Sequence, residues 1–343
     1  MRSDVRPIRI SLVATPDAMV SPISGLFEVL SSVGRTAAAA GGPEAGDEPL
    51  RPEIVADRPG PLRGASGLSI DAHRAFAEVV ATDVVVVPSV AMGYDGSWVP
   101  GRYPHVVRWI RAMHAGGATI CSSCSGGMLT AETGLLDGHE ATVHWLSEAD
   151  VRRRHPDIRL RPDEALVVSG EGGRLVTSGA STAWHDLALY LVARFVGPAS
   201  AQALARYQLM QWHREGQAAF HVFHPPTDHG DAVVLASQRW IDEHHGTSGP
   251  VEAMIRRSGL PASTFSRRFR AATGHSPIGY VQQIRIERAK RQLETTGDAV
   301  ERVSWAVGYE DAAAFRRVFR RLVGMTPGEY RRRFRLPEFR TSD

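Results

Sequence analysis

The strongest constraint on the fold is an internal repeat in the last third of the 343-residue chain. Residues Thr264 to Arg285 align with Ala314 to Arg335 at a constant offset of 50 positions. The pairs that match in this register are Phe265/Phe315, Arg267/Arg317, Phe269/Phe319, Gly274/Gly324, Pro277/Pro327, Tyr280/Tyr330 and Arg285/Arg335. Two copies are too few for a solenoid, which needs at least three stacked repeats. The repeat therefore predicts two similar modules that are presented side by side to a target that itself repeats.

Each copy has the pattern of two helices joined by a tight turn. In the first copy, a helix over Pro250 to Arg257 and a turn at Ser258-Gly259 precede a helix over Ala262 to Thr273. Pro261 is tolerated there because the first turn of a helix needs no backbone donor. In the second copy the corresponding segments are Val300 to Val307, the turn at Gly308, and Asp311 to Val323.

The second helix of each copy has an apolar back and an arginine-rich front. Phe265 and Phe269 lie four positions apart, and so do Phe315 and Phe319, which places each pair on one buried helix face. The positions left facing outward are Ser263, Arg267 and Arg270 in the first copy and Ala313, Arg316, Arg317 and Arg320 in the second. One such helix would be interpreted as a solvated face, but the same outward arginine in both copies favours the helix-turn-helix device. Arginine suits it because the guanidinium can bind phosphate or the edge of guanine with two hydrogen bonds.

The charge distribution supports a nucleic-acid partner for the last third only. Residues 231–343 contain 20 basic and 13 acidic side chains, a net charge of +7. Since the whole chain carries +3, residues 1–230 carry −4. A basic character confined to one region is the electrostatic footprint expected for DNA binding.

Three segments resemble the AraC-type DNA-binding module: Trp240 to His245, Phe265 to Glu294 and Val307 to Phe334. The resemblance implies that a helix over Ile278 to Thr295 joins two halves, whose recognition helices enter successive major-groove segments roughly 34 Å apart. It places the base-reading positions at Ser263, Ser266 and Arg267 and at Ala312, Ala313, Arg316 and Arg317. Arg270 and Arg320 complete the predicted DNA-binding set. The two alanines depart from the polar residues often seen there, so the second helix is expected to read thymine methyls or only phosphates.

The first 212 residues alternate strand and helix patterns, which predicts a doubly wound α/β domain. A linker over 213–231 and a helical domain over 232–335 follow. The predicted strands are Ile8 to Ala14, Asp83 to Pro88, Ala118 to Ser122, Thr142 to Trp145 and Gly173 to Thr177. The predicted helices are Ile23 to Ser31, Tyr103 to Ala115, Gly126 to Thr133 and Ala180 to Phe195, with a flexible loop over Arg35 to Glu48. His213, His221, His224 and His229 in the linker are predicted to be solvated, and no apolar run is long enough to span a membrane.

Cys124 is the candidate nucleophile of the first domain. It lies in the sequence ATICSSCSGG, at a sharp turn between a strand and a helix, with the small residues Ser122 and Gly126 that a nucleophile elbow needs. The dipole of the following helix is expected to favour the thiolate. A small packed residue is the plainer interpretation. The Cys121–Cys124 spacing also allows a redox pair or half of a zinc site, but no second pair completes a metal site.

Four segments of this region resemble PfpI-like (class I glutamine amidotransferase-like) domains of GlxA-type AraC regulators: Cys124 to Trp145, Ser24 to Leu30, Ser178 to Val192 and Trp212 to Phe220. The resemblance implies a flavodoxin-like fold and an elbow cysteine beside a carboxylate and often a histidine. Here Ser125 and not a histidine follows the cysteine. Val20 to Ser24, where the family carboxylate would come, contains no acid. A nucleophile without its base loses orders of magnitude in rate. His144 either substitutes in part for the missing base or packs in the core.

The sequence therefore predicts a cytoplasmic transcription regulator without a cofactor or catalytic residues, whose first domain is a retired enzyme. The expected partners are double-stranded DNA, RNA polymerase, a small-molecule effector and a second copy bound through the first domain. The candidate effector pocket is lined by Asp17, Glu28, Cys124 and His144. Two alternatives stay open: a working amidase or glyoxalase-type cysteine enzyme fused to a DNA-binding module, and a thiol redox sensor.

Overall fold

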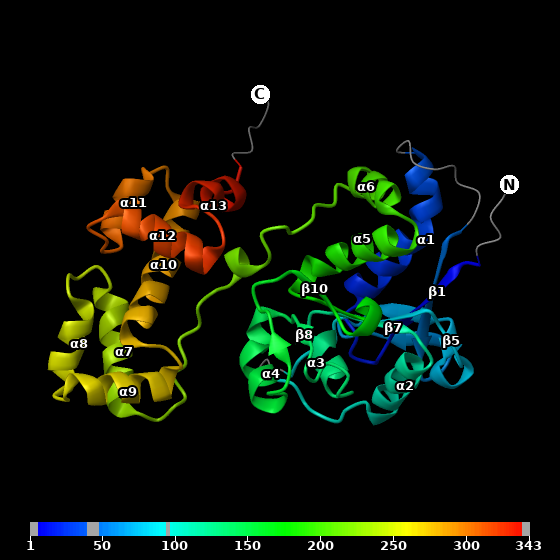
Figure 1. Ribbon diagram of the computed structural model, residues 1–343, viewed down its shortest axis with the longest axis horizontal. Coiled ribbons are helices and arrows are strands. Elements are labelled where there is room, and N and C mark those ends of the chain that lie inside the picture. The colour runs from blue at the N-terminus through cyan, green and yellow to red at the C-terminus, as the bar shows by residue number, and fades with distance from the viewer. Residues whose placement is uncertain (1–5, 40–47, 94–96, 338–343) are drawn as a thin grey trace. The chain divides into compact units, whose positions relative to one another are not determined.

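The chain folds into two compact units, residues 1–217 and residues 218–343, called here the N-terminal and C-terminal units. The structure is a computed structural model that describes residues 6–39, 48–93 and 97–337 (Figure 1). The two units are described separately below.

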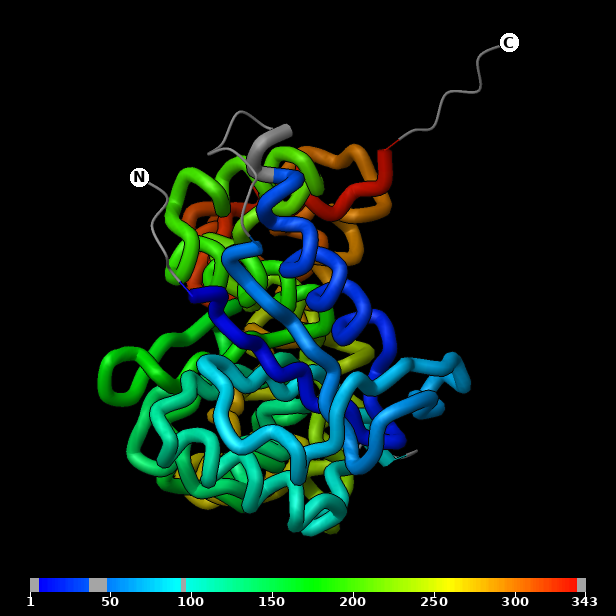
Figure 2. The backbone as a smooth tube through the Cα atoms, turned by 90° about the vertical axis from the view of Figure 1, so that its right-hand side faces the viewer, coloured from blue at the N-terminus to red at the C-terminus, as the bar shows by residue number. Residues whose placement is uncertain are grey.

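The N-terminal unit is built on one seven-stranded sheet with the strand order β10-β11-β7-β6-β1-β2-β5. The strands are β1 (Ile8–Val13), β2 (Leu50–Ala56), β5 (Arg74–Ala75), β6 (Val84–Val87), β7 (Thr119–Ser123), β10 (Leu166–Ser169) and β11 (Leu175–Ser178). All neighbours pair in parallel except β10 with β11, and β1 runs beside β2 in Figure 2. The five central strands follow the flavodoxin-like order, in which ligands bind beyond the carboxyl ends of the strands.

Helices cover both faces of this sheet because its strands are apolar on both sides. One face packs on α1 (Val20–Ala39), α5 (Trp184–Phe195) and α6 (Pro198–Tyr207), and the other on α2 (Pro104–Ala115), α3 (Gly126–Ala131) and α4 (Glu148–Arg154). The strand period of two divides the side chains between the two cores: Val84 and Val86 enter the first, Val85 and Val87 the second. Two small pairs of strands, β3 (Gly60–Arg63) with β4 (Ser69–Ala72) and β8 (Glu140–Ala141) with β9 (Arg159–Leu160), lie outside the main sheet.

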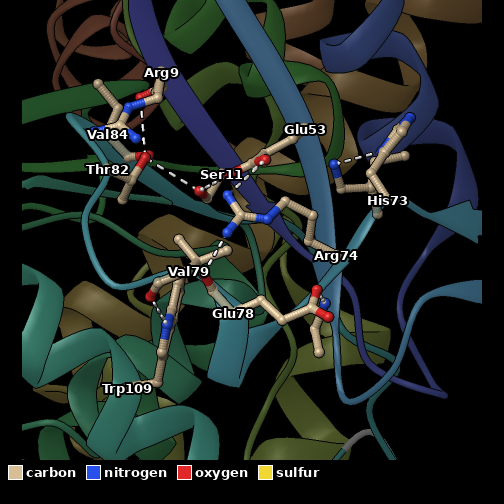
Figure 3. A network of polar contacts seen from close by, with 12 residues as sticks. Arg9, Ser11, Glu53, His73, Arg74, Glu78, Val79, Thr82, Val84 and Trp109 are labelled. Carbon is tan, nitrogen blue, oxygen red and sulfur yellow. Dashed lines mark hydrogen bonds and ion pairs between the residues drawn. The ribbon is translucent and has the colours of Figure 1, made fainter.

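The β1–β2–β5 edge of the sheet is fixed by a network of polar side chains (Figure 3). The hydroxyl of Ser11 lies 3.1 Å from Glu53 Oε1 and 3.1 Å from Thr82 Oγ1. The other carboxylate oxygen of Glu53 is 3.5 Å from the Arg74 guanidinium, which also donates to the Glu78 carbonyl. The network satisfies polar groups beside the core and ties the two-residue strand β5 to its neighbours.

The doubly wound α/β prediction is confirmed, and two of its local details are wrong. The strand predicted over Thr142 to Trp145 does not form: β8 ends at Ala141, and Trp145 begins a single 3-10 turn. The predicted loop from Arg35 is helical as far as Ala39, because an alanine run has the highest helix propensity and simply extends α1. Residues 40–47 of that loop lie outside the described residues.

The C-terminal unit consists of two small helical cores joined by one long helix, as the AraC-type resemblance implied. Its helices are α7 (Ala232–His244), α8 (Pro250–Ser258), α9 (Ala262–Thr273), α10 (Pro277–Thr295), α11 (Val300–Ala306), α12 (Ala312–Val323) and α13 (Pro327–Phe334). The first part of α10 packs with α7, α8 and α9, and its last part with α11, α12 and α13.

The repeat in the sequence is a repeat of aromatic packing. In the first core the rings of Phe265, Phe269 and Tyr280 contact one another in series, with centroids 5.5 and 5.2 Å apart. The second core repeats this series with Phe315, Phe319 and Tyr330 at 5.6 and 5.6 Å. Such edge-on and tilted contacts favour one packing over others, which explains why these residue types recur at one offset.

Arg285 connects the two cores through its side chain. It is only 9% exposed, and its guanidinium donates to the carbonyls of His245 (2.7 Å) and Thr247 (2.9 Å) and lies over the Tyr309 ring. Burial lowers the pKa of this arginine from its ordinary value, although it stays charged. Among the described residues, no helix is both long and apolar enough to cross a membrane.

Candidate nucleic-acid interface and elbow cysteine

The first candidate recognition helix, α9, presents free cationic side chains to solvent. The helix begins after Pro261 and ends at Gly274, which adopts a left-handed φ of +74° that favours glycine. Ser263, Arg267 and Arg270 are exposed and Ser266 is partly buried. Among the described residues, no ion-pair partner approaches the guanidinium of Arg267 or Arg270. Both arginines line a cavity of about 700 Å³ beside α9, together with Val251, Ser266, Ala271, Ser276, Pro277 and Ile278.

The second candidate helix, α12, carries two of its arginines, Arg316 and Arg317, in ion pairs within its own half of the unit, whereas no ion pair among the described residues involves Arg320. The Asp311 side chain caps the helix by accepting from the backbone N–H groups of Ala313 (2.8 Å) and Ala314 (3.1 Å). The same carboxylate is 3.9 Å from Arg317, while Arg316 pairs with Glu301 of α11. Both pairs are solvent-exposed and therefore weak, so DNA phosphates can replace the carboxylates at small cost.

The other DNA-binding candidates of α12 differ in their exposure to solvent. Ala313 and Arg320 are exposed, whereas Ala312 is partly buried. Because three alanines stand at the start of α12, this end of the helix offers methyl groups and no hydrogen-bonding side chain except that of Asp311.

Cys124 has the backbone geometry of a nucleophile elbow. It follows β7 and precedes α3, and its φ of +55° lies in the left-handed region that residues other than glycine rarely adopt. The turn is held by the Cys124 N–H, which donates to the Ser178 carbonyl (2.9 Å), and by a very close approach at Gly126. A Cβ added at Gly126 would lie 2.2 Å from the Val87 carbonyl oxygen and 2.4 Å from that of Pro88. Only glycine therefore allows α3 to start at this point.

The surroundings of Cys124 do not activate its thiol. The residue is 8% exposed, and burial raises the pKa of the thiol despite lowering contributions from Ser89 and Ser125. The expectation that the helix dipole favours the thiolate is therefore wrong, because loss of solvation outweighs it. The Ser125 hydroxyl donates to the Val90 carbonyl (2.6 Å) and accepts from the Val90 N–H (3.0 Å), so it clamps the loop after β6.

The four pocket candidates are distributed over different parts of the N-terminal unit. Asp17 lies near the elbow, where Thr15, Arg102 and Tyr103 bind its carboxylate at 2.8, 2.5 and 2.5 Å. Glu28 instead lines a cavity of about 700 Å³ formed by α1, α5 and the end of α6. The other residues lining that cavity are Gly25, Val29, Ser32, Arg35, Thr36, Trp184, His185, Tyr207, Gln208, Leu209 and Met210. His144 accepts from the Leu146 N–H and packs on Trp145.

Sequence reasoning missed the polar residues that fix the end of the N-terminal unit. The carboxylate of Asp186 is almost fully buried and accepts from the His213 backbone N–H (2.8 Å) and from its ring Nδ1 (2.7 Å). The prediction of a solvated His213 is therefore wrong. Gln217 is also buried, and its amide binds four loop positions described below. No local pattern marks these residues, because their partners lie 27 to 75 positions away in sequence.

Comparison with known proteins matches both units. A model of the DJ-1/PfpI family matches residues 35–194, and a helix-turn-helix domain model matches residues 254–333. The HTH-type transcriptional regulator CdhR of Pseudomonas aeruginosa is 26% identical over 280 residues, which cover 79% of each chain. The HTH-type transcriptional regulator GlxA of Rhizobium meliloti is 27% identical over 83% of this chain and 90% of its own. The chain combines a DJ-1/PfpI domain with an AraC-type helix-turn-helix domain.

A solved AraC family transcriptional regulator from Pseudomonas putida also aligns with this regulator. It shares 19% sequence identity and a TM-score of 0.47, and it covers 59% of this chain and all of its own. Within the regulator, the DJ-1/PfpI match contains the elbow Cys124, and the helix-turn-helix match contains both α9 and α12.

Proposed function

We propose that this DNA-binding transcription regulator reads its operator chiefly with α9 and uses α12 mainly as an anchor. Arg267 and Arg270 support this assignment because their guanidinium groups are exposed and have no ion-pair partner among the described residues. Ser263 and Ser266 add hydroxyls on the same helix. On α12, Arg316, Arg317 and Arg320 bind phosphates, while Ala312 and Ala313 contact thymine methyls.

The test of this proposal is selection of genomic DNA fragments by the full-length chain at one fixed, near-physiological salt concentration. We expect enrichment of a motif with two segments about one helical turn, or roughly ten base pairs, apart. The α9 segment of the motif should have the higher information content. Binding that depends on salt but not on sequence would contradict the proposal, because it would leave only the phosphate contribution.

We infer that the N-terminal unit senses an effector and has no enzyme activity. The raised pKa of Cys124 and the commitment of Ser125 and Asp17 to structural hydrogen bonds support this inference. The strained φ of Cys124 favours the alternative, a cysteine enzyme of the amidase or glyoxalase type. The alternative requires turnover of model amides or methylglyoxal that disappears in Cys124→Ala. Equal rates for both proteins would reject it, and oxidant-sensitive DNA binding lost in Cys124→Ser would instead support a redox sensor.

For the effector, we propose the cavity that contains Glu28. Its volume of about 700 Å³ falls within the range of small-molecule sites, and the Trp184 indole supplies an apolar wall. A library of small metabolites can be screened by thermal shift against the wild type, Glu28→Ala and Cys124→Ala. A ligand whose stabilisation is lost in Glu28→Ala alone supports this cavity, and one lost in Cys124→Ala alone supports a pocket at the elbow.

We further propose that the regulator acts in the cytoplasm as a homodimer through its N-terminal unit and contacts RNA polymerase. Paired DNA sites call for a two-fold symmetric protein. Sedimentation of residues 1–217 and of the full chain tests the first point, since a monomer in either case would reject it. Transcription in vitro with purified polymerase and the selected operator tests the second.

A further inference from the structure

The stretch between the two units contains little free chain, because each unit binds part of it. Residues 210–217 form the last ordered layer of the N-terminal unit, in which Met210 and Trp212 pack on its core and Asp186 binds His213. From Ala218 onward the chain packs on the C-terminal unit. Ala219 enters the core of α11 to α13, and Lys290 donates to the His221 carbonyl.

The last residue of the N-terminal unit, Gln217, is buried and hydrogen-bonded through both its backbone and its side chain. It is 3% exposed, and its backbone N–H donates to the Asp163 carbonyl (2.7 Å). Its side-chain NH₂ lies within hydrogen-bond distance of the Val143 carbonyl (3.0 Å), the Pro162 carbonyl (2.8 Å) and Thr142 Oγ1 (3.1 Å). Its side-chain oxygen accepts from the Ala180 N–H (2.8 Å). One amide therefore ties together three loops that follow β8, β9 and β11.

Two glycines show that the structure is shaped around this residue. A Cβ at Gly179 would lie 2.4 to 2.6 Å from the amide atoms of Gln217. At Gly216 a Cβ would lie 2.0 Å from the Asp163 carbonyl oxygen, and the φ of +68° also favours glycine. The hydrogen-bonded amide of Gln217 cannot move aside for a methyl group at Gly179 without losing its partners.

The end of β11 and the loop after it connect Gln217 to the elbow. Ser178 accepts from the Cys124 N–H, and Ala180, two residues later, donates to Gln217. Only two hydrogen bonds and a short piece of backbone therefore separate the carboxyl edge of the sheet, where doubly wound domains bind ligands, from the start of the DNA-binding unit.

We propose that Gln217 is a latch that sets the length of free chain between the two units and links it to the carboxyl edge of the sheet. When the latch is closed, the free chain between the two units is confined to the backbone around Gln217 and Ala218. When it opens, His213 to Gln217 detach, and five extended residues add roughly 17 Å of reach, about half a turn of DNA. A structural change at the turn that contains Cys124 thus alters the largest distance that can separate the C-terminal units of two protomers.

The test is hydrogen exchange of the full-length chain in a double-mutant cycle. In Gln217→Ala we expect the amides of residues 213–217 to exchange roughly tenfold faster or more, since buried hydrogen bonds are lost, while β6 stays protected. Gln202→Ala, an exposed glutamine of α6 outside the proposed effector cavity, should change nothing. As a single variant, Gly179→Ala should accelerate exchange as Gln217→Ala does, because its methyl group displaces the Gln217 amide. In the double variant that amide is already absent, so Gly179→Ala should add little further acceleration.

Several outcomes would overturn the latch. One is unchanged exchange of residues 213–217 in Gln217→Ala. Another is equal loosening of β6, which would make Gln217 a residue of general stability. A third is a Gly179→Ala effect that adds in full to that of Gln217→Ala.

The DNA consequence rests on the proposed function and is measured separately. Gln217→Ala should keep the affinity for one operator half but bind pairs of halves with a weaker preference for spacing. A spacing preference equal to that of the wild type would refute the control of reach. If the wild type shows no sequence-specific binding, the proposed function fails and the exchange result still decides the latch.

Discussion

Removal of one arginine from each recognition helix gives the most direct test of the DNA interface. The double variant Arg267→Ala/Arg317→Ala removes the outward arginine shared by both copies of the repeat. A base-specific contact contributes about 1–3 kcal/mol. Arg267 has no ion pair to lose, so we expect its replacement to cost the full contribution. Arg317 first has to leave Asp311, an exposed pair worth up to about 1 kcal/mol, so its net contribution should be smaller.

The two helices belong to different cores, so their contributions should add, and we expect a total loss of about 2–5 kcal/mol. This loss corresponds to roughly a 30-fold to several-thousand-fold weaker operator complex. The assay is fluorescence anisotropy with the selected operator at one salt concentration. Arg239→Ala/Arg291→Ala is the matched control, because it removes two exposed arginines from α7 and α10 with the same change in net charge. Affinity within twofold of the wild type, or an equal loss in the control, would refute the assignment of α9 and α12.

Three further predictions concern the elbow, the second helix and the buried thiols. Gly126→Ala should lower the free energy of unfolding of the N-terminal unit by about 1–3 kcal/mol in urea, because the added methyl group meets two carbonyl oxygens, whereas Gly116→Ala should be nearly neutral. Glu301→Ala releases Arg316 and should strengthen operator binding by a few-fold at most; weaker binding would mean that the ion pair positions the arginine. Burial raises the pKa of Cys121 to about 12, whereas the thiol of the unfolded chain ionises near pH 9. As the pH rises above about 9, only the unfolded state gains from ionising this thiol, so the folded state loses stability. Unfolding measured at pH 8 and pH 10 should show a drop about 1 kcal/mol larger for the wild type than for Cys121→Ala, and equal drops would contradict it.

The helical unit could be predicted almost to the residue because its signals are local. The helix predicted over Ala262 to Thr273 is α9 as observed, since a proline before it, a glycine after it and two phenylalanines four apart determine its limits and its face. The continuous valine run of β6 was equally clear, because only a strand covered on both faces is apolar throughout.

The N-terminal unit was predictable in outline but not in its polar detail. Thr142 was predicted in a strand, yet its N–H donates to Thr177 Oγ1 and its hydroxyl to the Glu164 carbonyl, so side chains and loops replace a strand partner. The candidate site has the same limit. The elbow at Cys124 could be found because its strand, turn and helix are contiguous, whereas its raised pKa depends on burial by distant segments.

The two halves of the DNA-binding unit differ in a way that suits unequal roles. Arg268 of α9 is paired with Asp231, but the outward Arg267 and Arg270 have no ion-pair partner among the described residues, while Arg316 and Arg317 of α12 already have carboxylate partners. Replacing those exposed carboxylates by phosphate costs little, so α12 can bind many sequences with similar affinity. A helix with free arginines and hydroxyls discriminates more strongly, because a mismatched base leaves its polar groups unpaired. The repeat thus preserves the aromatic core in both copies, while the residues in front of that core differ, which supports the proposal that α9 reads the operator and α12 anchors the unit.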